Sequence, residues 1–488
     1  MTQKEMQSIL EIGTAISSEK DYNRLLEMIL NRIMELTHAD AGTLYLADGD
    51  LLRFKIMCNN TMHTCEGGDG KEPNLPPVKL SRENVCAMCY LENRTVCIEN
   101  VRTSTEYDFS GPVRYDAMTG YHTQSMLVVP MHNRQGERLG VIQLINAMDA
   151  AGNICAFPAD IIPAVESVAS QAAITIQNVL YIENIKELFE SFVRVMSSAV
   201  DERTPYNASH TRHMVEYGRH FIDYLNETAK AEGREPWFDA EHRHELLMSV
   251  WLHDIGKLVI PLEVMNKEAR LLPEQKSEIL HRFERMRLLA QIACLKGAIS
   301  GEALEKRLEE LKQDGDTILR ANTAGFCPDD LREEICRIRE KTYTEEDGSE
   351  KPWLEEEEFQ MLMIRKGTLS EKERAVMESH VVITDKLLSE IRFSKELSHV
   401  REWAASHHEL LNGSGYPEHL MAEQIPMEVR IITILDIFDA LVADDRPYKP
   451  GMPVEKALGI LDIMADKEGK LDPELTRLFR KSRCWEKD

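Results

Sequence analysis

The chain has 488 residues, of which 43% are hydrophobic and 29% are charged. This length exceeds what one ordinary core supports, and the composition is typical of soluble globular proteins, so we expect two compact domains joined by a connector. The formal net charge of -25 argues against a nucleic-acid polymer as the main partner, because such binding depends on neutralisation of phosphates by lysine and arginine. A small phosphate ligand remains compatible with this charge, since a few local cations or metal ions suffice to hold it.

The sequence contains no apolar run long enough to cross a bilayer, and it starts without the basic and apolar segments of a signal peptide. We therefore expect no membrane span and a cytoplasmic protein. In that setting the ten cysteines are expected to be free thiols or metal ligands rather than a disulfide framework.

The first third of the sequence predicts an α+β domain with a largely antiparallel sheet. Residues 21–38 carry apolar side chains at helical spacing, which indicates an amphipathic helix. Strands are predicted at 42–47, 51–57, 125–131 and 139–145, with turns at 48–50 and 133–137.

This order of elements, with residues 126–131 and 140–146 as the matching stretches, resembles a GAF domain over about residues 5–180. The resemblance implies a sensor domain for an unknown small ligand. Cyclic-nucleotide-binding GAF domains have a lysine directly after the Asn of the second stretch, where this chain has Ala147. Residues 157–160 also fit the rest of that signature poorly, which argues against a cyclic nucleotide as the ligand.

A long helix is predicted over residues 162–200, where glycine is scarce and Pro163 lies at the entrance, a position that helices tolerate. Apolar residues there recur at heptad spacing: Val165, Ala172, Val179, Val193 and Val200, with Val168, Ile182, Phe189 and Met196 between them. This pattern, interrupted by Thr175 and Lys186, predicts a parallel dimeric connector and hence a homodimer. The alternative is a helix buried against its own domain.

After this helix the sequence predicts only helices and loops. Residues 268–366 are rich in charge and have helical apolar spacing without a chemical motif, which predicts an inserted helical hairpin or subdomain. The expected organisation is therefore a GAF-like domain at 1–164, a connecting helix at 165–200, and a helical domain at 201–488 with an insertion at about 268–366.

The strongest chemical signal is His253-Asp254-Ile255-Gly256-Lys257, which follows an apolar helix. Imidazole and carboxylate groups can each bind a divalent cation, and a carboxylate can bridge two. A lone histidine is more often structural, but here an ordered series of companions follows the same pattern. They are His210, His380, His407, His408 and Asp436.

These residues, together with Asn-Gly-Ser-Gly-Tyr-Pro at 412–417, resemble the HD-GYP family over residues 201 to about 455, interrupted by the insertion. The resemblance implies an all-α fold of the HD superfamily with two divalent cations, usually iron or manganese, bridged by Asp254. The implied metal ligands are His210, His253, Asp254, His380, His407, His408 and Asp436. It also implies that His253, Asp254 and Lys257 are catalytic. The residues implied to contact substrate are Lys257, Tyr416, Arg446 and Lys449.

Two departures from the family pattern affect the metal count. Some members hold a third metal with a glutamate four residues before the first histidine, where this chain has Tyr206, so a binuclear site is expected. His213 stands where the family usually has arginine, and we do not assign it as a ligand. Asp439 is expected to orient a ligand.

The family's activity implies hydrolysis of cyclic di-GMP to linear pGpG, with GMP as a further product, under control of the GAF-like domain. Three alternatives stay open. The substrate could be 3′,3′-cyclic GMP-AMP, or the domain could be a catalytically silent module that binds a cyclic dinucleotide. The third is another metal-dependent nucleotide hydrolase of the HD superfamily, against which the Gly-Tyr-Pro loop at 415–417 argues.

Four cysteines of the first third form a separate hypothesis. Cys86 and Cys89 have the spacing of metal ligands, and Cys58 with Cys65 could complete a site for zinc or an iron-sulfur cluster. The alternative is buried or incidental thiols, since the four are not two matched CxxC pairs.

Overall fold

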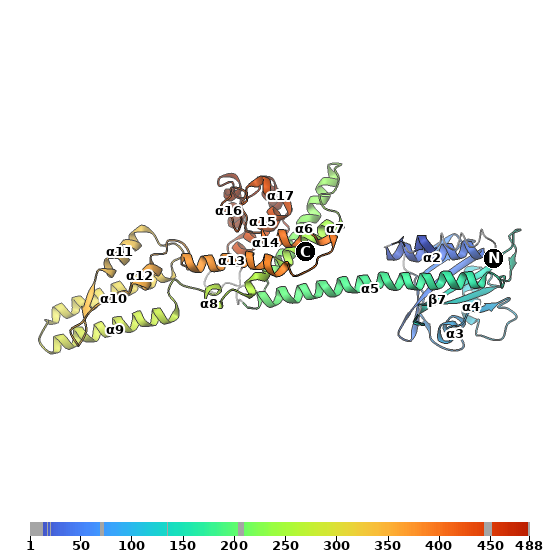
Figure 1. Cartoon of the computed structure of the whole chain (residues 1–488), viewed down its shortest axis with the longest axis horizontal. Coiled ribbons are helices and arrows are strands. Elements are labelled where there is room, and N and C mark those ends of the chain that lie inside the picture. Colours follow the sequence, from blue (N-terminus) through green and yellow to red (C-terminus); the bar gives the residue numbers. More distant parts are fainter. Residues whose placement is uncertain are drawn as a thin grey trace. The chain divides into compact units, whose positions relative to one another are not determined.

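A computed structural model describes residues 13–16, 18–19, 21–68, 73–133, 135–203, 209–443 and 451–486. The chain forms two compact units, Met1–Phe189 and Glu190–Asp488, here called the first and second unit. Helix α5 (Ile162–Asp201) runs from one into the other (Figure 1).

The first unit is an antiparallel sheet with helices on its faces. Its sheet has the strand order β3-β2-β1-β7-β6-β5, with β4 on β2 and β8 on β7. In chain order the elements are α2 (Tyr22–Thr37), β1 (Ala39–Asp48), β2 (Leu51–Asn59), β3 (Thr64–Gly67), β4 (Val78–Lys79), α3 (Val85–Glu92), β5 (Val96–Ile98), α4 (Ser110–Thr119), β6 (Met126–His132), β7 (Arg138–Met148) and β8 (Ile154–Cys155). The α+β prediction with an antiparallel sheet is confirmed.

Alternation along the strands divides this unit into two cores. Leu44, Leu46 and Leu127 belong to the core under α2 and α5, whereas their neighbours Tyr45 and Val128 belong to the core that includes α3. Successive side chains of a strand point to opposite faces, so the two cores lie on opposite faces of the sheet.

The predicted dimer seam is wrong for most of its residues. Val165, Val168, Ala172 and Val179 are buried in the first unit's own core, so a helix packed against its own domain describes them better. Val193 and Val200 are buried as well. Two seam residues, Ile182 and Met196, are exposed. The other exposed large apolar residues of α5 are Tyr181, Ile185, Leu188, Phe192 and Val195.

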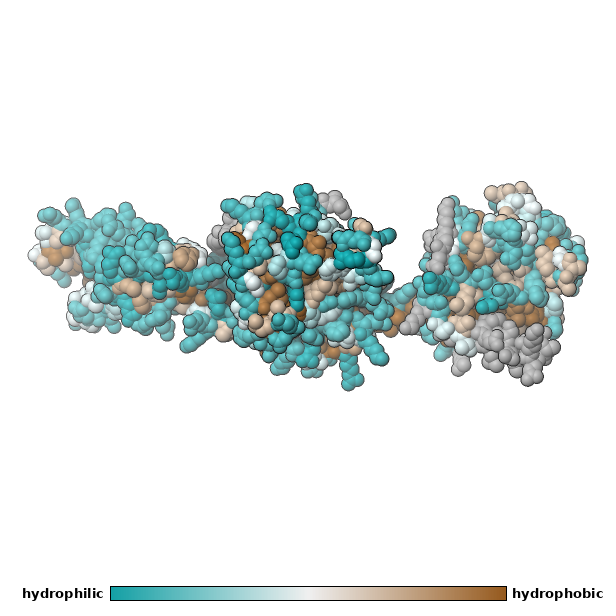
Figure 2. All heavy atoms as spheres, turned by 90° about the horizontal axis from the view of Figure 1, so that it is seen from above, coloured by the Kyte–Doolittle hydropathy of each residue, from teal (hydrophilic) through white to brown (hydrophobic). Residues whose placement is uncertain are grey.

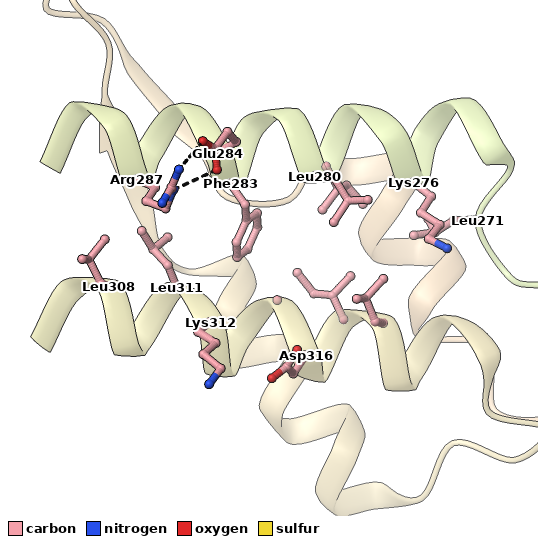
Figure 3. Close-up of a pocket in the computed structure, with 14 residues that line it drawn as sticks. Leu271, Lys276, Leu280, Phe283, Glu284, Arg287, Leu308, Leu311, Lys312 and Asp316 are labelled. Atoms are coloured by element: carbon pink, nitrogen blue, oxygen red, sulfur yellow. Dashed lines mark hydrogen bonds and ion pairs between the residues drawn. The ribbon is translucent and has the colours of Figure 1, made fainter. Parts of the chain in front are cut away.

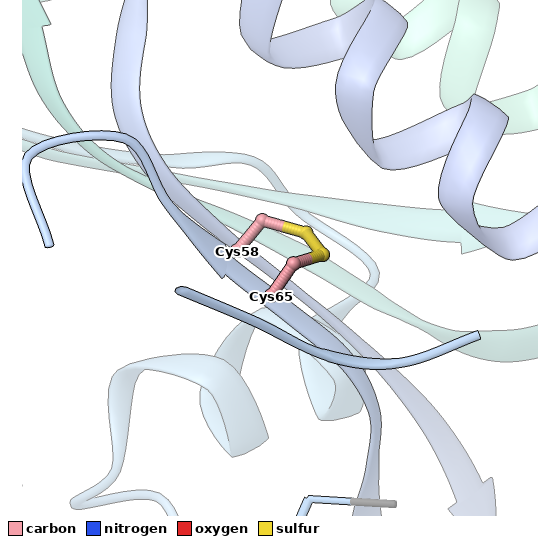
Figure 4. Close-up of a disulfide and its surroundings, with 2 residues drawn as sticks. All are labelled: Cys58 and Cys65. Atoms are coloured by element: carbon pink, nitrogen blue, oxygen red, sulfur yellow. A yellow bond between two sulfur atoms is a disulfide. The ribbon is translucent and has the colours of Figure 1, made fainter. Parts of the chain in front are cut away.

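The cysteines also differ from the prediction. Cys58 and Cys65 are opposed on β2 and β3 and form a disulfide (Figure 4), so they are neither free thiols nor ligands. Cys86 and Cys89 lie in the core on the other face of the sheet, where burial raises the pKa of the Cys86 thiol to about 12 and keeps it protonated. The four cysteines therefore do not form one metal site.

The second unit is helical, as predicted, except for one short β-hairpin within the insertion, which the sequence did not predict. Its elements outside the insertion are α6 (His210–Ala231), α7 (Ala240–Leu252), the 3₁₀ turn η1 (Ile255–Leu258), α8 (Leu262–Met265), α13 (Glu371–Leu388), η2 (Lys395–Leu397), α14 (Val400–Ala405), η3 (Ala422–Gln424), α15 (Met427–Val442), α16 (Val454–Asp466) and α17 (Pro473–Ser482). Helix α15 lies at the centre of their common core, with Ile431, Ile434 and Phe438 fully buried.

Between α8 and α13 the chain forms a subdomain with its own core around the buried Trp353. It contains α9 (Pro273–Leu295), α10 (Gly301–Thr323), α11 (Asp329–Arg339), the hairpin β9 (Thr342–Thr344) and β10 (Glu350–Pro352), and α12 (Glu356–Leu362). A cleft of about 290 Å³ between α9 and α10 is lined by apolar side chains such as Phe283 and Leu311 (Figure 3).

The segments that lead into and out of this subdomain are joined by an ion pair and a hydrogen bond. The Nζ atom of Lys267 lies 2.7 and 2.9 Å from the carboxylate oxygens of Glu373. The hydroxyl of Thr368 donates a hydrogen bond of 3.0 Å to the carbonyl of Lys267. The Lys267 side chain is only 3% exposed, so this ion pair is shielded from water.

In the described parts of the chain, no helix is both long enough and apolar enough to span a membrane. Most of the surface visible in Figure 2 is hydrophilic, with small apolar patches between the polar regions. This distribution agrees with the high content of charged residues.

Candidate metal centre

The second unit brings together side chains from five separate segments. His210 begins α6, His253 and Asp254 lie between α7 and η1, and His380 is in α13. His407 and His408 follow α14, and Asp436 is in α15. These are the seven metal ligands implied by the family resemblance, and in the structure they form one cluster.

The Asp254 carboxylate lies between two groups of imidazoles. Its Oδ1 atom is 3.5 Å from His380 Nε2 and 3.9 Å from His407 Nε2. Its Oδ2 atom is 3.2 Å from His253 Nε2 and 3.8 Å from His210 Nε2. Each carboxylate oxygen therefore faces a different pair of potential ligands, which is the arrangement required of a bridging group.

Asp436 also lies close to both groups. Its Oδ1 atom lies 3.4 Å from His210 Nε2, and its Oδ2 atom lies 3.6 Å from His408 Nδ1. Within the groups His380, His407, His408 and His210, His253, Asp254, one ligand atom per residue lies within 4.8 Å of the others. The two groups therefore lie next to each other, and the carboxylates of Asp254 and Asp436 are each close to both groups.

Local backbone contacts fix three imidazoles in the tautomer that can bind a metal. The Nδ1 atoms of His253, His380 and His407 each donate to the carbonyl three residues earlier, at 2.7 Å in every case. A carbonyl only accepts, so Nδ1 carries the proton and Nε2 of the neutral ring has a free lone pair.

Several buried polar atoms lack a partner in the cluster. Among the described residues, Nε2 of His253, His380 and His407 and Oδ1 of Asp254 have no hydrogen-bond partner. Such atoms are costly to bury unless something else satisfies them, and divalent cations bind imidazole nitrogen and carboxylate oxygen. The residues present therefore fit a pair of divalent metal ions.

The protonation states of His380, His407 and Asp254 agree with this interpretation. Burial lowers the pKa of His380 to about 4 and that of His407 well below its usual value, so both rings stay neutral near pH 7. Burial opposes ionisation of Asp254, but His253 and Lys257 outweigh it and hold the pKa of Asp254 well below its usual range. Neutral imidazoles and an ionised bridging carboxylate are the forms that bind metal.

The His210 ring is held by a carboxylate instead of a backbone carbonyl. Its Nδ1 atom lies 2.6 Å from Asp439 Oδ2, as expected for a residue that orients a ligand. Burial alone would lower the pKa of His210, but Asp436 and Asp439 raise it to about 10. His213 lies 3.5 Å from Asp439 Oδ1 and is not part of either ligand group.

A glycine allows the motif to pack against α13. A Cβ atom on Gly256 would lie 1.9 Å from the carbonyl oxygen of His380, so no larger residue fits. Thr384 fastens the contact, because its hydroxyl donates to the carbonyl of His253 at 3.1 Å and accepts from the Gly256 amide at 3.0 Å. This close approach brings Asp254 and His380 into one site.

Glu409 shapes the loop beside the cluster, a role that the sequence did not reveal. This buried carboxylate accepts hydrogen bonds from the amides of Glu418 at 2.7 Å and Leu420 at 2.9 Å. It thereby holds the loop that carries Tyr416, whose ring centroid is 4.8 Å from that of His408. The only available signal was its place directly after the two histidines.

Of the implied substrate contacts, only Lys257 and Tyr416 lie in the described chain. The Lys257 ammonium is 2.5 Å from Asp254 Oδ2. Burial alone would lower the pKa of Lys257, but Asp254 and Asp436 raise it, so the group stays charged. Arg446, Lys449 and the third-metal position Tyr206 lie outside the described residues.

Comparison with known proteins identifies both parts of the chain. Residues 21–176 match the GAF domain model and residues 357–475 match an HD domain model. The chain therefore carries a GAF domain followed by an HD domain. The HD match includes His380, His407, His408 and Asp436, and the fold places His210, His253 and Asp254 close to them.

Three curated relatives are similar over part of the chain. The chain is 36% identical over 121 residues to 3′3′-cGAMP-specific phosphodiesterase 3 of Vibrio cholerae serotype O1, 25% of each chain. It is 40% identical over 102 residues to the cyclic di-GMP phosphodiesterase response regulator RpfG of Xanthomonas campestris pv. campestris, 20% of this chain and 26% of that one. It is 36% identical over 121 residues to the cyclic di-GMP phosphodiesterase of Thermotoga maritima, 25% of this chain and 32% of that one. The chain thus spans about a quarter to a third of the length of these relatives.

Proposed function

We propose that the protein is a metal-dependent phosphodiesterase that hydrolyses cyclic di-GMP to linear pGpG, with the GAF domain as its regulator. The observation that carries the proposal is the Asp254 carboxylate placed between two groups of imidazoles. The names of the relatives support a cyclic dinucleotide as the substrate class.

Each residue of the cluster has a definable role in this reaction. His210 and His253 on one side, and His380, His407 and His408 on the other, would hold two cations, iron or manganese, with Asp254 and Asp436 between them. When bound, such ions supply positive charge to the phosphodiester and lower the pKa of a water molecule. Lys257 keeps its charge at the edge of the cluster and would neutralise a substrate phosphate.

An assay of the metal-loaded chain tests this proposal. Cyclic di-GMP and 3′,3′-cyclic GMP-AMP would be supplied separately and the products separated by chromatography. The second substrate is the alternative, because a relative with that specificity matches at 36% identity, the same value as a cyclic di-GMP enzyme. Linear pGpG as the main product is expected. Binding without hydrolysis of either compound would show a silent signalling module instead.

We propose further that the protein is a homodimer formed through the exposed face of α5. Tyr181, Ile185, Leu188, Phe192 and Val195 are spaced alternately by four and three residues, and each is between 53% and 66% exposed. This is the a and d spacing of a coiled coil, which lets the same face of a second copy pack in register. A sensor ligand that shifts this packing could reach the second unit through α5.

Replacing Ile185 and Leu188 with lysine tests the dimer. The charges would lie in the centre of the interface, so the variant is expected to sediment as a monomer at micromolar concentration with unchanged metal content. Glu183→Lys, on the opposite side of the proposed coiled coil, is the control and should stay dimeric. A monomeric unsubstituted chain would refute the interface.

A further inference from the structure

The end of α5 contacts the two segments that carry the first metal ligands. Arg203 follows the helix, and its Nη1 atom donates to the carbonyl of Lys257 at 3.0 Å and to that of Leu258. Its Nη2 atom donates to the carbonyl of Ile260 at 3.3 Å. One guanidinium therefore binds three carbonyls at the C-terminal end of η1, where such groups lack helical partners.

A second contact lies at the last residue of the same helix. Asp201 is 6% exposed and accepts a hydrogen bond of 3.0 Å from the hydroxyl of Thr211. Thr211 is adjacent to His210 at the start of α6. Asp201 and Arg203 thus attach the same helix end to His210 on one side and to the His253–Lys257 segment on the other.

We infer that Arg203 is a positioning residue of the metal centre. Five donors in a fixed planar group hold η1 in one orientation, which sets Asp254 and Lys257 relative to His210. Among the described residues, the hydrogen bonds of Arg203 all go to backbone carbonyls, so its role is to place other groups. The inference rests on the proposed function and identifies a residue on which the metal site depends.

The experiment compares Arg203→Ala and Arg203→Lys in the full chain. Outer partners of metal ligands typically change metal affinity or activity about 10- to 100-fold when removed, so Arg203→Ala should weaken Mn²⁺ binding and lower kcat by that factor. Arg203→Lys supplies charge but cannot reach three carbonyls at once. Its Mn²⁺ affinity and kcat should therefore lie between those of Arg203→Ala and those of the unsubstituted chain. Added guanidinium ion should restore part of the loss in Arg203→Ala.

Arg219→Ala provides the matched control, since Arg219 is an exposed arginine of α6, and it should change neither quantity. Unchanged Mn²⁺ affinity and kcat in Arg203→Ala would overturn the inference. The inference would also be overturned if Arg203→Ala lost Mn²⁺ affinity and kcat together with cooperative thermal unfolding, and guanidinium restored neither quantity. If the unsubstituted chain hydrolyses no cyclic dinucleotide, the proposed function fails, while Mn²⁺ affinity still decides the role of Arg203.

Discussion

Replacement of Asp254 by asparagine is expected to lower kcat for cyclic di-GMP hydrolysis by about three orders of magnitude. The variant keeps the size of the side chain but loses the charge, and one oxygen becomes an amide nitrogen that cannot bind a cation. Because each oxygen faces a different imidazole group, one substitution disturbs both metal positions. A loss of about 4 kcal/mol of charge stabilisation corresponds to this factor. Steady-state kinetics with metal analysis would measure it.

Two companion variants make this result interpretable. His253→Ala removes one ligand and should also abolish hydrolysis, whereas His281→Ala, an exposed histidine of α9, should leave the rate unchanged. Circular dichroism should show the same helical content in all three. Activity of Asp254→Asn within tenfold of the unsubstituted chain would contradict the bridging role.

Removal of the metal ions should abolish hydrolysis and lower the melting temperature by about 10 °C. Three buried Nε2 atoms, which have no hydrogen-bond partner among the described residues, would then be left unsatisfied. A ligand at a thousand times its dissociation constant stabilises the folded state by about 4 kcal/mol, and each kcal/mol shifts the midpoint of a unit this large by about 2–4 °C. Dialysis against a chelator, followed by calorimetry, would test this.

Adding Mn²⁺ or Fe²⁺ back should restore both properties, with two ions per chain by elemental analysis. Asp254→Asn serves as the control, since its melting temperature should respond weakly to the same additions. Three ions per chain would show that the site is not binuclear. An equally stable and active protein after complete metal removal would refute the metal centre.

The sequence identified the cluster because metal chemistry restricts which residues can serve. Histidine and aspartate at spaced positions in a helical domain have few other reasons to recur in one ordered series. The ring orientations and the Glu409 contacts were not predictable, since they depend on backbone carbonyls and amides brought close only by folding. Arg203 escaped notice for the same reason, because nothing in its neighbourhood in the sequence indicates a carbonyl partner.

The connecting helix shows the opposite case. Val165 and Val179 fit a heptad, but a heptad pattern records only that one helix face is apolar. It does not show whether that face packs on the helix's own domain or on a second copy. Likewise, the pairing of Cys58 with Cys65 follows from the register of β2 and β3, which their spacing alone does not define.

The ion pair between Lys267 and Glu373 affects how the chain can fold. These residues are 106 positions apart, and a ligand of the cluster lies on each side of them. If the intervening subdomain folds first around Trp353, its ends are brought together and the chain between Asp254 and His380 behaves as a short loop. Closing a short loop costs roughly 1.5 kcal/mol less entropy than closing the full length. The insertion can therefore be long without delaying assembly of the ligands.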